Sequence, residues 1–162
     1  TTRHARLIPA LAAFVLAAFV LATTAMAQSA PDFSGNWVLN NTKGKNLGMV
    51  AAVQEAVAVT QTADQLTLDI AATFQGNTSK RQVNYDLKGT PVQNEGAMGD
   101  TAETVAKWDG GKLVVTWTAE GAIAGTKTVR TETRSLSADG KTMTVVSQRG
   151  SNAPMELVYE KK

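Results

Sequence analysis

The sequence predicts an all-β protein whose strands close into an antiparallel up-and-down barrel. Apolar and polar residues alternate along most of the chain after residue 28, turn residues separate the alternating runs, and few long loops are present. Alternation with a period of two is typical of strands that bury one face. Strands joined by short turns pair antiparallel, and closure into a barrel removes the exposed edges. A two-sheet sandwich is the alternative, but it needs crossovers for which the sequence has few long loops.

Residues 1–27 have the features of a secretory signal peptide. Basic residues within positions 3–6 precede an unbroken apolar run over 10–22, and residues 25–27 read Ala-Met-Ala, a site for signal peptidase. As a helix, the apolar run would rise about 20 Å, which is too short for a hydrocarbon core of about 30 Å. We therefore expect cleavage after residue 27, export to the periplasm or the extracellular space, no membrane span after cleavage, and a single barrel domain over 28–162.

The composition of the mature chain excludes several classes of function. Removing residues 1–27 takes away the one histidine, two of the 16 basic residues and none of the 14 acidic residues, so the formal net charge becomes zero. A neutral chain without a basic stripe has no general attraction for nucleic acid. The absence of cysteine and histidine excludes Ser-His-Asp and Cys-His catalysis and metal sites built on these ligands. We therefore expect no catalytic residue, no metal and no cofactor.

Nine segments show the pattern of strands. They are residues 36–40, 57–62, 66–74, 82–87, 102–108, 113–119, 126–136, 143–146 and 155–160. Asp109-Gly110 and Asp139-Gly140 separate two pairs of these segments, and Asp-Gly is typical of hairpin turns because glycine adopts a positive φ at low cost. The sequence therefore predicts eight or nine strands, each paired antiparallel with its neighbour along the chain.

Residues 47–56 break the alternation. This segment (LGMVAAVQEA) is rich in alanine and contains Gln and Glu, which have good helix propensity. We predict a short helix here, between the first and second strands. An extended covering loop is the alternative.

Four motifs resemble those of a known family. Residues 32–40 read Asp-Phe-Ser-Gly-Asn-Trp-Val-Leu-Asn, a Trp-Asp-Gly hairpin follows at 108–113, an Asp-Gly-Lys-Thr hairpin lies at 137–142, and the last strand ends in Tyr-Glu-Lys within 158–161. In this order they resemble a family of small secreted bacterial proteins that is similar to the lipocalins and fatty-acid-binding proteins. The resemblance implies a calycin-like barrel in which Trp37, in the Gly-x-Trp box, closes one end.

The last strand departs from the pattern of the intracellular fatty-acid carriers. Those proteins end in an Arg-x-Tyr strand whose two side chains bind the carboxylate of the ligand. Here the strand retains Tyr159 but has Leu157 where the arginine would lie. The carboxylate clamp of that family therefore does not transfer, although Tyr159 remains a candidate ligand contact. The segment 47–56 also lacks the prolines of closer relatives.

Large apolar residues on the strand faces are candidates either for a pocket wall or for a filled core. Trp117, Leu68 and Ile70 are the candidate wall residues, because ligand pockets are mostly apolar with a few polar groups. Trp37 and Trp108 are predicted as structural residues at a barrel end. The sequence does not decide whether Trp117 faces a ligand or only packs in the core.

Arg130, Glu132 and Arg134 form the most informative polar group. They share one face of the segment 126–136 with Leu136. If Leu136 points inward, both guanidinium groups enter the barrel, where Glu132 would satisfy one and leave the other to anchor an anionic head group. If the strand lies at an edge or twists, the three charges are solvated instead.

These features favour an exported barrel that binds a small apolar or amphipathic ligand without catalysis. The alternative is a filled barrel that acts as an envelope component through protein contacts. A cavity of roughly 300 Å³ or more would favour the first function, and a fully packed core would favour the second. A histidine-free enzyme that uses carboxylates or Tyr159 is a third reading with less support.

Overall fold

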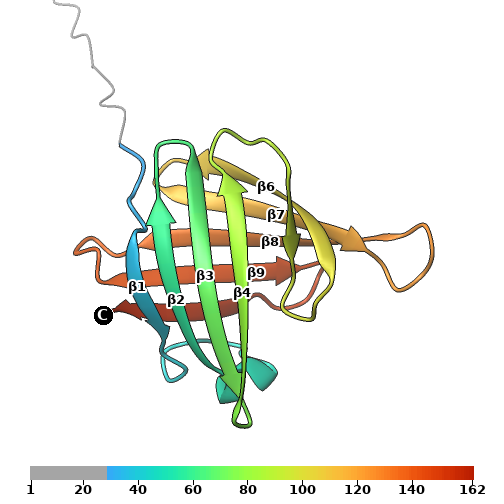
Figure 1. Cartoon of the computed structure of the whole chain (residues 1–162), viewed down its shortest axis with the longest axis horizontal. Coiled ribbons are helices and arrows are strands. Elements are labelled where there is room, and N and C mark those ends of the chain that lie inside the picture. Colours follow the sequence, from blue (N-terminus) through green and yellow to red (C-terminus); the bar gives the residue numbers. More distant parts are fainter. Residues whose placement is uncertain (1–28) are drawn as a thin grey trace, which may run out of the picture.

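The computed structural model describes residues 29–162, and these form a ten-stranded antiparallel sheet that curves into a nearly closed barrel (Figure 1). The signal peptide predicted over 1–27 lies outside the described residues. The strands are β1 (Gly35–Leu39), β2 (Gln54–Gln61), β3 (Gln65–Phe74), β4 (Asn77–Asp86), β5 (Val92–Glu95), β6 (Thr101–Asp109), β7 (Lys112–Glu120), β8 (Lys127–Leu136), β9 (Thr142–Arg149) and β10 (Met155–Lys161). The spatial order β4-β3-β2-β1-β10-β9-β8-β7-β6-β5 confirms the predicted antiparallel, neighbour-to-neighbour barrel.

The number of strands differs from the prediction of eight or nine. The additional strand is β5, which has only four residues and forms its ladder with β6. Its sequence, Val-Gln-Asn-Glu, is too short and too polar to show a clear alternation. Short edge strands of this kind gain their conformation from the neighbouring strand rather than from their own propensity.

The helix predicted over residues 47–56 is correct only for its first half. Gly48–Ala52 forms a single stretch of 3-10 helix, η1, and β2 already begins at Gln54. Residues Gln54 to Ala56 pair with Thr73 to Ala71 of β3. A helix of ten residues is marginal by itself, so hydrogen bonding to an existing strand outweighs its propensity. Among residues 29–162, no helix is long and apolar enough to cross a membrane.

One end of the barrel is closed by aromatic side chains. Trp37 has no exposed surface, and its indole N–H donates to the carbonyl of Phe33 at 2.9 Å. The Phe33 ring stacks on the partly buried Trp108 with ring centroids 6.1 Å apart. Gly35 has a φ of +134°, and a Cβ atom there would lie 2.6 Å from Cε of Lys161. The glycine of the Gly-x-Trp box therefore leaves room for Lys161, whose Nζ lies 5.2 Å from the centroid of the Trp37 ring.

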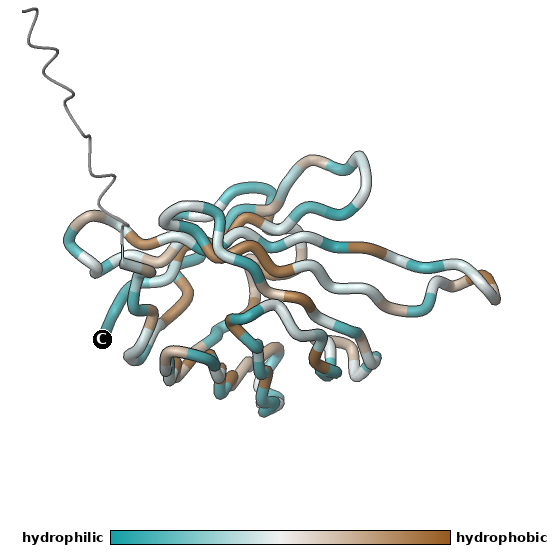
Figure 2. Tube along the Cα trace, turned by 90° about the horizontal axis from the view of Figure 1, so that it is seen from above, coloured by the Kyte–Doolittle hydropathy of each residue, from teal (hydrophilic) through white to brown (hydrophobic). Residues whose placement is uncertain are grey.

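The interior is filled unevenly along the barrel axis. Hydrophobic and hydrophilic residues alternate along the strands in Figure 2, as expected for a sheet with one buried face. Next to the closed end the interior is packed with aliphatic side chains that are at most 1% exposed, including Leu66, Leu113 and Met143. Toward the opposite end, charged side chains enter the interior. We call the part around Leu66, Leu113 and Met143 the closed half, and the part that the charged side chains enter the open half.

A side chain closes the seam between β4 and β5. The described residues form no backbone ladder between these two strands. Instead, Oδ1 of the buried Asn94 accepts from the backbone N–H of Asn84 at 2.8 Å, and its Nδ2 donates to the carbonyl of Asn84 at 2.8 Å. Nδ2 also donates to Oγ1 of Thr104 at 2.7 Å. Because a carboxamide offers the same donor and acceptor as a peptide group, Asn94 replaces one step of the missing ladder.

Candidate functional site

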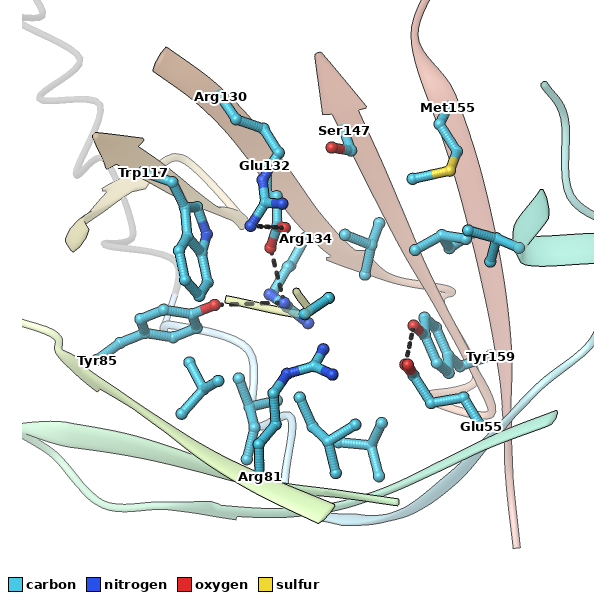
Figure 3. Close-up of a pocket in the computed structure, with 18 residues that line it drawn as sticks. Glu55, Arg81, Tyr85, Trp117, Arg130, Glu132, Arg134, Ser147, Met155 and Tyr159 are labelled. Carbon is cyan, nitrogen blue, oxygen red and sulfur yellow. Dashed lines mark hydrogen bonds and ion pairs between the residues drawn. The ribbon is translucent and has the colours of Figure 1, made fainter. Parts of the chain in front are cut away.

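A pocket of about 150 Å³ occupies the open half of the barrel. Figure 3 shows charged and aromatic side chains along one side of it and Arg81 reaching in from the other. The wall built from β2, β3 and β4 is otherwise mainly aliphatic, with Val57, Leu68, Ile70 and Val83. The pocket has about half the volume of roughly 300 Å³ that we set as the mark of a ligand cavity. It has the size of a cavity that holds a single benzene molecule.

The face of β8 that carries Arg130, Glu132 and Arg134 points into this pocket. The carboxylate of Glu132 lies between the two arginines: its Oε1 is 3.2 Å from Nη2 of Arg130, and its Oε2 accepts from Nη2 of Arg134 at 2.9 Å. Arg134 and Glu132 are nearly buried, and Arg130 is half-buried. The expectation that Glu132 would satisfy only one guanidinium group is therefore wrong, because its two oxygens pair with both.

Aromatic rings hold the two guanidinium groups from the side of β7 and β4. Cζ of Arg130 lies 4.6 Å from the centroid of the Trp117 ring, and Cζ of Arg134 lies 5.7 Å from that of Tyr85. The Trp117 and Tyr85 rings meet edge to face with centroids 6.1 Å apart. Cation–π contacts of this kind are attractive, and more so when desolvated. These contacts restrict the positions of both guanidinium groups.

Burial sets the protonation states in the pocket. It raises the pKa of Tyr85, and it raises the pKa of Tyr159, which the carboxylate of Glu55 raises further. Burial opposes the charge of Arg134, but the surrounding Tyr85, Glu132 and Tyr159 outweigh it and raise the pKa of the guanidinium group. At neutral pH both tyrosines are therefore neutral, and Arg134 keeps its charge.

Tyr159 is already engaged by a neighbouring acid. Its hydroxyl donates to Oε1 of Glu55 at 2.7 Å, and both residues line the pocket. The proton of Tyr159 is therefore not free for a ligand, whereas its oxygen still offers an acceptor. Leu157, which stands where the fatty-acid carriers have an arginine, lines the same pocket.

Arg81 on β4 is one of two charged pocket residues that our sequence analysis missed. Among residues 29–162 its guanidinium group has no ion-pair partner. The signal was present, because Arg81 precedes Val83 and Tyr85 at steps of two and so shares their inward face. We also missed Glu55, which falls within the segment that we predicted as a helix.

The pocket has more hydrogen-bond donors and more positive charge than it can satisfy. Three guanidinium groups line it against two carboxylates, those of Glu55 and Glu132. In the part of the chain that the structure describes, three buried N–H groups have no acceptor: Nε1 of Trp117, Nε of Arg130 and Nε of Arg134. A buried donor without a partner costs about 1–3 kcal/mol. An anion with two or more oxygens would supply what is missing.

All seven residues predicted as ligand contacts line this one pocket. They are Trp117, Arg130, Glu132, Arg134, Tyr159, Leu68 and Ile70. Their contact with a ligand stays a prediction. Trp37 and Trp108, predicted as structural, lie in the closed half. Residues 29–162 contain no cluster of three or more side chains of the metal-binding types His, Cys, Asp and Glu.

No protein-family model matches the sequence, and no curated protein matches it. Solved structures do match its fold. A fatty acid transporter, REP1-NXSQ, is 14% identical with a TM-score of 0.63 over 81% of this chain and 96% of its own. The apo form of lipid binding protein 8 of Caenorhabditis elegans is 13% identical with a TM-score of 0.63, over 80% and 95% of the two chains.

Human cRBP IV is 15% identical with a TM-score of 0.59, over 82% of this chain and 99% of its own. At such low identities these likenesses show the fold, which is the calycin-like barrel that the resemblance implied. They cover nearly the full length of each solved chain. The ligand chemistry must be argued from the pocket of this protein itself.

Proposed function

We propose that this protein is an exported barrel that binds one small amphipathic molecule through an anionic head group and does not catalyse a reaction on it. Membership in the secreted bacterial family whose opening box it resembles is part of the proposal. The signal-peptide pattern at residues 1–27 supports export. Barrels of the same fold that are named for fatty acid transport and lipid binding support the class of ligand.

The observation that carries the proposal is the surplus of donors in the pocket. Hydrogen bonds from guanidinium groups to a carboxylate are charge-assisted and geometrically specific, and they strengthen in a partly buried site. Glu132 forms ion pairs with both Arg130 and Arg134. The guanidinium group of Arg81 is therefore the one that an external anion would pair with. Opposite the charged face of β8, the aliphatic side chains of β2, β3 and β4 offer an apolar surface to the remainder of the same molecule.

A comparison of hexanoate with hexanol tests this proposal. The two molecules differ mainly in charge, and calorimetric titration of the purified protein measures the affinity for each. We expect the acid to bind about tenfold to a hundredfold more tightly, since a hydrogen bond to a charged group contributes about 1.5–3 kcal/mol. Equal affinities for acid and alcohol would contradict an anionic head group.

Variants of β4 connect this preference to the pocket. Arg81→Met should bind hexanoate and hexanol equally, because the unpaired guanidinium group is gone. Lys80→Met is the matched control: it removes one positive charge from the neighbouring exposed residue on the other face of β4, and it should retain the preference. A preference that survives in Arg81→Met and disappears in Arg130→Met or Arg134→Met would move the anchor to β8.

The filled barrel without a ligand is the second candidate, and the small volume of the pocket favours it. In that case neither hexanoate nor hexanol would bind, and the buried guanidinium groups would serve only to fill the open half. Native mass spectrometry of protein purified from its own host gives an independent answer, because a carried ligand adds a defined mass.

The proposed export has its own test. The mature protein in the envelope fraction should begin at Gln28 or within a few residues of it, since residues 25–27 read Ala-Met-Ala. N-terminal sequencing measures this directly. Retention of the apolar run at 10–22 in the mature protein would contradict the signal peptide.

A further inference from the structure

We infer that the ligand is a compact carboxylate whose hydrocarbon part is one ring or a short chain of about five carbons, rather than a long acyl chain. This inference rests on the proposed function and specifies the class of molecule that the same pocket takes. Three observations support it: the volume of the pocket, the packing of the closed half, and the way in which charge is distributed along the pocket wall.

The volume limits the apolar part of the ligand. The pocket of about 150 Å³ must hold both the head group and whatever hydrocarbon is buried with it. A cavity of about this size holds one benzene molecule, and sites for larger ligands begin at roughly 300 Å³. A chain of the length found in membrane lipids does not fit in this space.

The closed half gives a longer chain no room to extend. Leu66, Leu113 and Met143 are at most 1% exposed and belong to the same packed core as Trp37 and Phe33. A close-packed core resists the insertion of extra methylene groups, because they force side chains off their rotamers and shift the backbone. The floor of the pocket is therefore a fixed boundary for the ligand.

Charge is distributed along the whole of one wall. Arg130, Glu132 and Arg134 follow one another at every second position of β8, so they extend over about 13 Å of strand at 3.3 Å per residue. The facing wall of β2 to β4 is mainly aliphatic, and its polar side chains are Glu55, Arg81 and Tyr85. A long chain lying along the barrel axis would have to desolvate this charged stripe without satisfying it, which is unfavourable. A compact ligand instead has its charge and its hydrocarbon within the width of the pocket.

The chain-length dependence of binding tests this inference. Calorimetric titration of the purified protein with straight-chain carboxylates from acetate to hexadecanoate, each below its micelle concentration, measures it. We expect the affinity to rise by about fourfold for each added carbon up to about hexanoate, because each methylene group is buried. Beyond hexanoate it should stay within about twofold, because further carbons extend through the mouth into water. Benzoate should bind about as tightly as hexanoate. An affinity that continues to rise to hexadecanoate would overturn the inference.

Alcohols of the same lengths keep this test separate from the test of the head group. Equal affinities of acids and alcohols at every length would contradict the anionic head group and leave the size limit standing. A steady rise to sixteen carbons together with a preference for acids would contradict the size limit and leave the head group standing.

Two leucine variants of β3 locate the boundary. Leu68 lines the pocket, whereas Leu66, two residues away on the same inward face, lies in the closed half. Leu68→Ala should enlarge the pocket and move the plateau to acids about three carbons longer, the number of carbons removed. Leu66→Ala carries a similar loss of packing and should leave the plateau unchanged. Melting curves show whether both variants fold, and the wild-type series decides the inference if either does not. A shift with Leu66→Ala as large as that with Leu68→Ala would contradict a fixed floor.

Discussion

Trp37 and Trp117 show how differently the two halves of the barrel are built. Both side chains are buried, at 0% and 6% exposed. In the closed half the indole N–H of Trp37 donates to a backbone carbonyl, and the core side chains around it are apolar, with Lys161 over one face of the ring. In the open half the indole N–H of Trp117 has no acceptor in the described part of the chain, and a guanidinium group covers its ring. The buried indole donor of the closed half has an acceptor, whereas three buried N–H donors of the open half have none among the described residues.

This difference indicates that the two halves of one sheet serve different ends, the closed half stability and the open half binding. Buried polar groups without partners lower stability, and natural proteins retain such groups mainly where a function needs them. The same strands contribute to both halves: on β3 both Leu66 and Leu68 are buried in the core, and Leu68 also lines the pocket. Substitutions in the closed half should therefore change stability, and those in the open half should change binding.

Removing Trp37 should have the largest effect on stability. Trp37→Ala leaves a large void among packed side chains and should lower the free energy of unfolding by about 3–5 kcal/mol. Urea denaturation followed by circular dichroism measures the loss. Trp108→Ala, at the partly exposed end of the same cluster, should cost less. A near-zero change for Trp37→Ala would mean that the closed half does not depend on its aromatic end.

Glu132→Gln, in the open half, should lower the stability of the protein and at the same time strengthen its binding of hexanoate. The change leaves Arg130 and Arg134 without a carboxylate, and it should lower the free energy of unfolding by about 1.5–3 kcal/mol. The same change adds positive charge to the pocket and should strengthen the binding of hexanoate. Thermal melts with and without hexanoate measure both effects. Unchanged stability and affinity would indicate that these charges are solvated.

High pH should destabilise the protein through its two tyrosines, Tyr85 and Tyr159, which both line the open half. Their pKa values are raised above the ordinary value of 10, mainly by burial. Above pH 10 the unfolded chain releases protons that the folded chain retains. The free energy of unfolding should therefore fall by about 1.4 kcal/mol per pH unit for each tyrosine, and this stability is fully present below pH 10.

Urea midpoints between pH 8 and pH 11 measure this dependence. Tyr85→Phe removes one titrating group and should make the decline shallower, and Tyr159→Phe should do the same. If neither variant changes the slope, the alkaline loss comes from other groups, such as the exposed lysines.

Arg81→Met should have the smallest effect on stability. Because Arg81 has no ion-pair partner among residues 29–162, its loss should change the free energy of unfolding by no more than about 0.5 kcal/mol. Its effect should appear in ligand affinity instead. Urea denaturation of Arg81→Met beside Glu132→Gln measures the contrast. A loss from Arg81→Met as large as that from Glu132→Gln would mean that Arg81 has a structural role.

The sequence was sufficient for the architecture because alternation and turns report directly on strands. The order and direction of nine strands follow from period-two patterns and Asp-Gly turns, whereas β4 begins at Asn77 and not at residue 82, and β9 extends to Arg149 and not only to residue 146. The pattern fails where a segment takes its conformation from a neighbour. Residues 54–56 have helix-forming composition but pair with β3, and β5 is too short to show a period.

The site was predictable in part, because alternation assigns a residue to a face but does not say which residues meet across the barrel. The inward face of β8 could be proposed as a group since its three charges lie on one strand. The pairing of Glu132 with both arginines depends on side-chain rotamers that no spacing encodes. Tyr159 meets Glu55 across 104 positions of the chain, so their hydrogen bond has no local signal at all.

The carboxamide of Asn94 makes the junction between the two edge strands depend on one side chain. It is the group that bridges β4 and β5, and it does so with one donor nitrogen and one acceptor oxygen. Deamidation to aspartate would replace that nitrogen by an oxygen that repels the carbonyl of Asn84. The loss of one amide group would then open the seam while every backbone ladder stayed intact. The opened seam would be detected as faster exchange of the amide protons along β4 and β5.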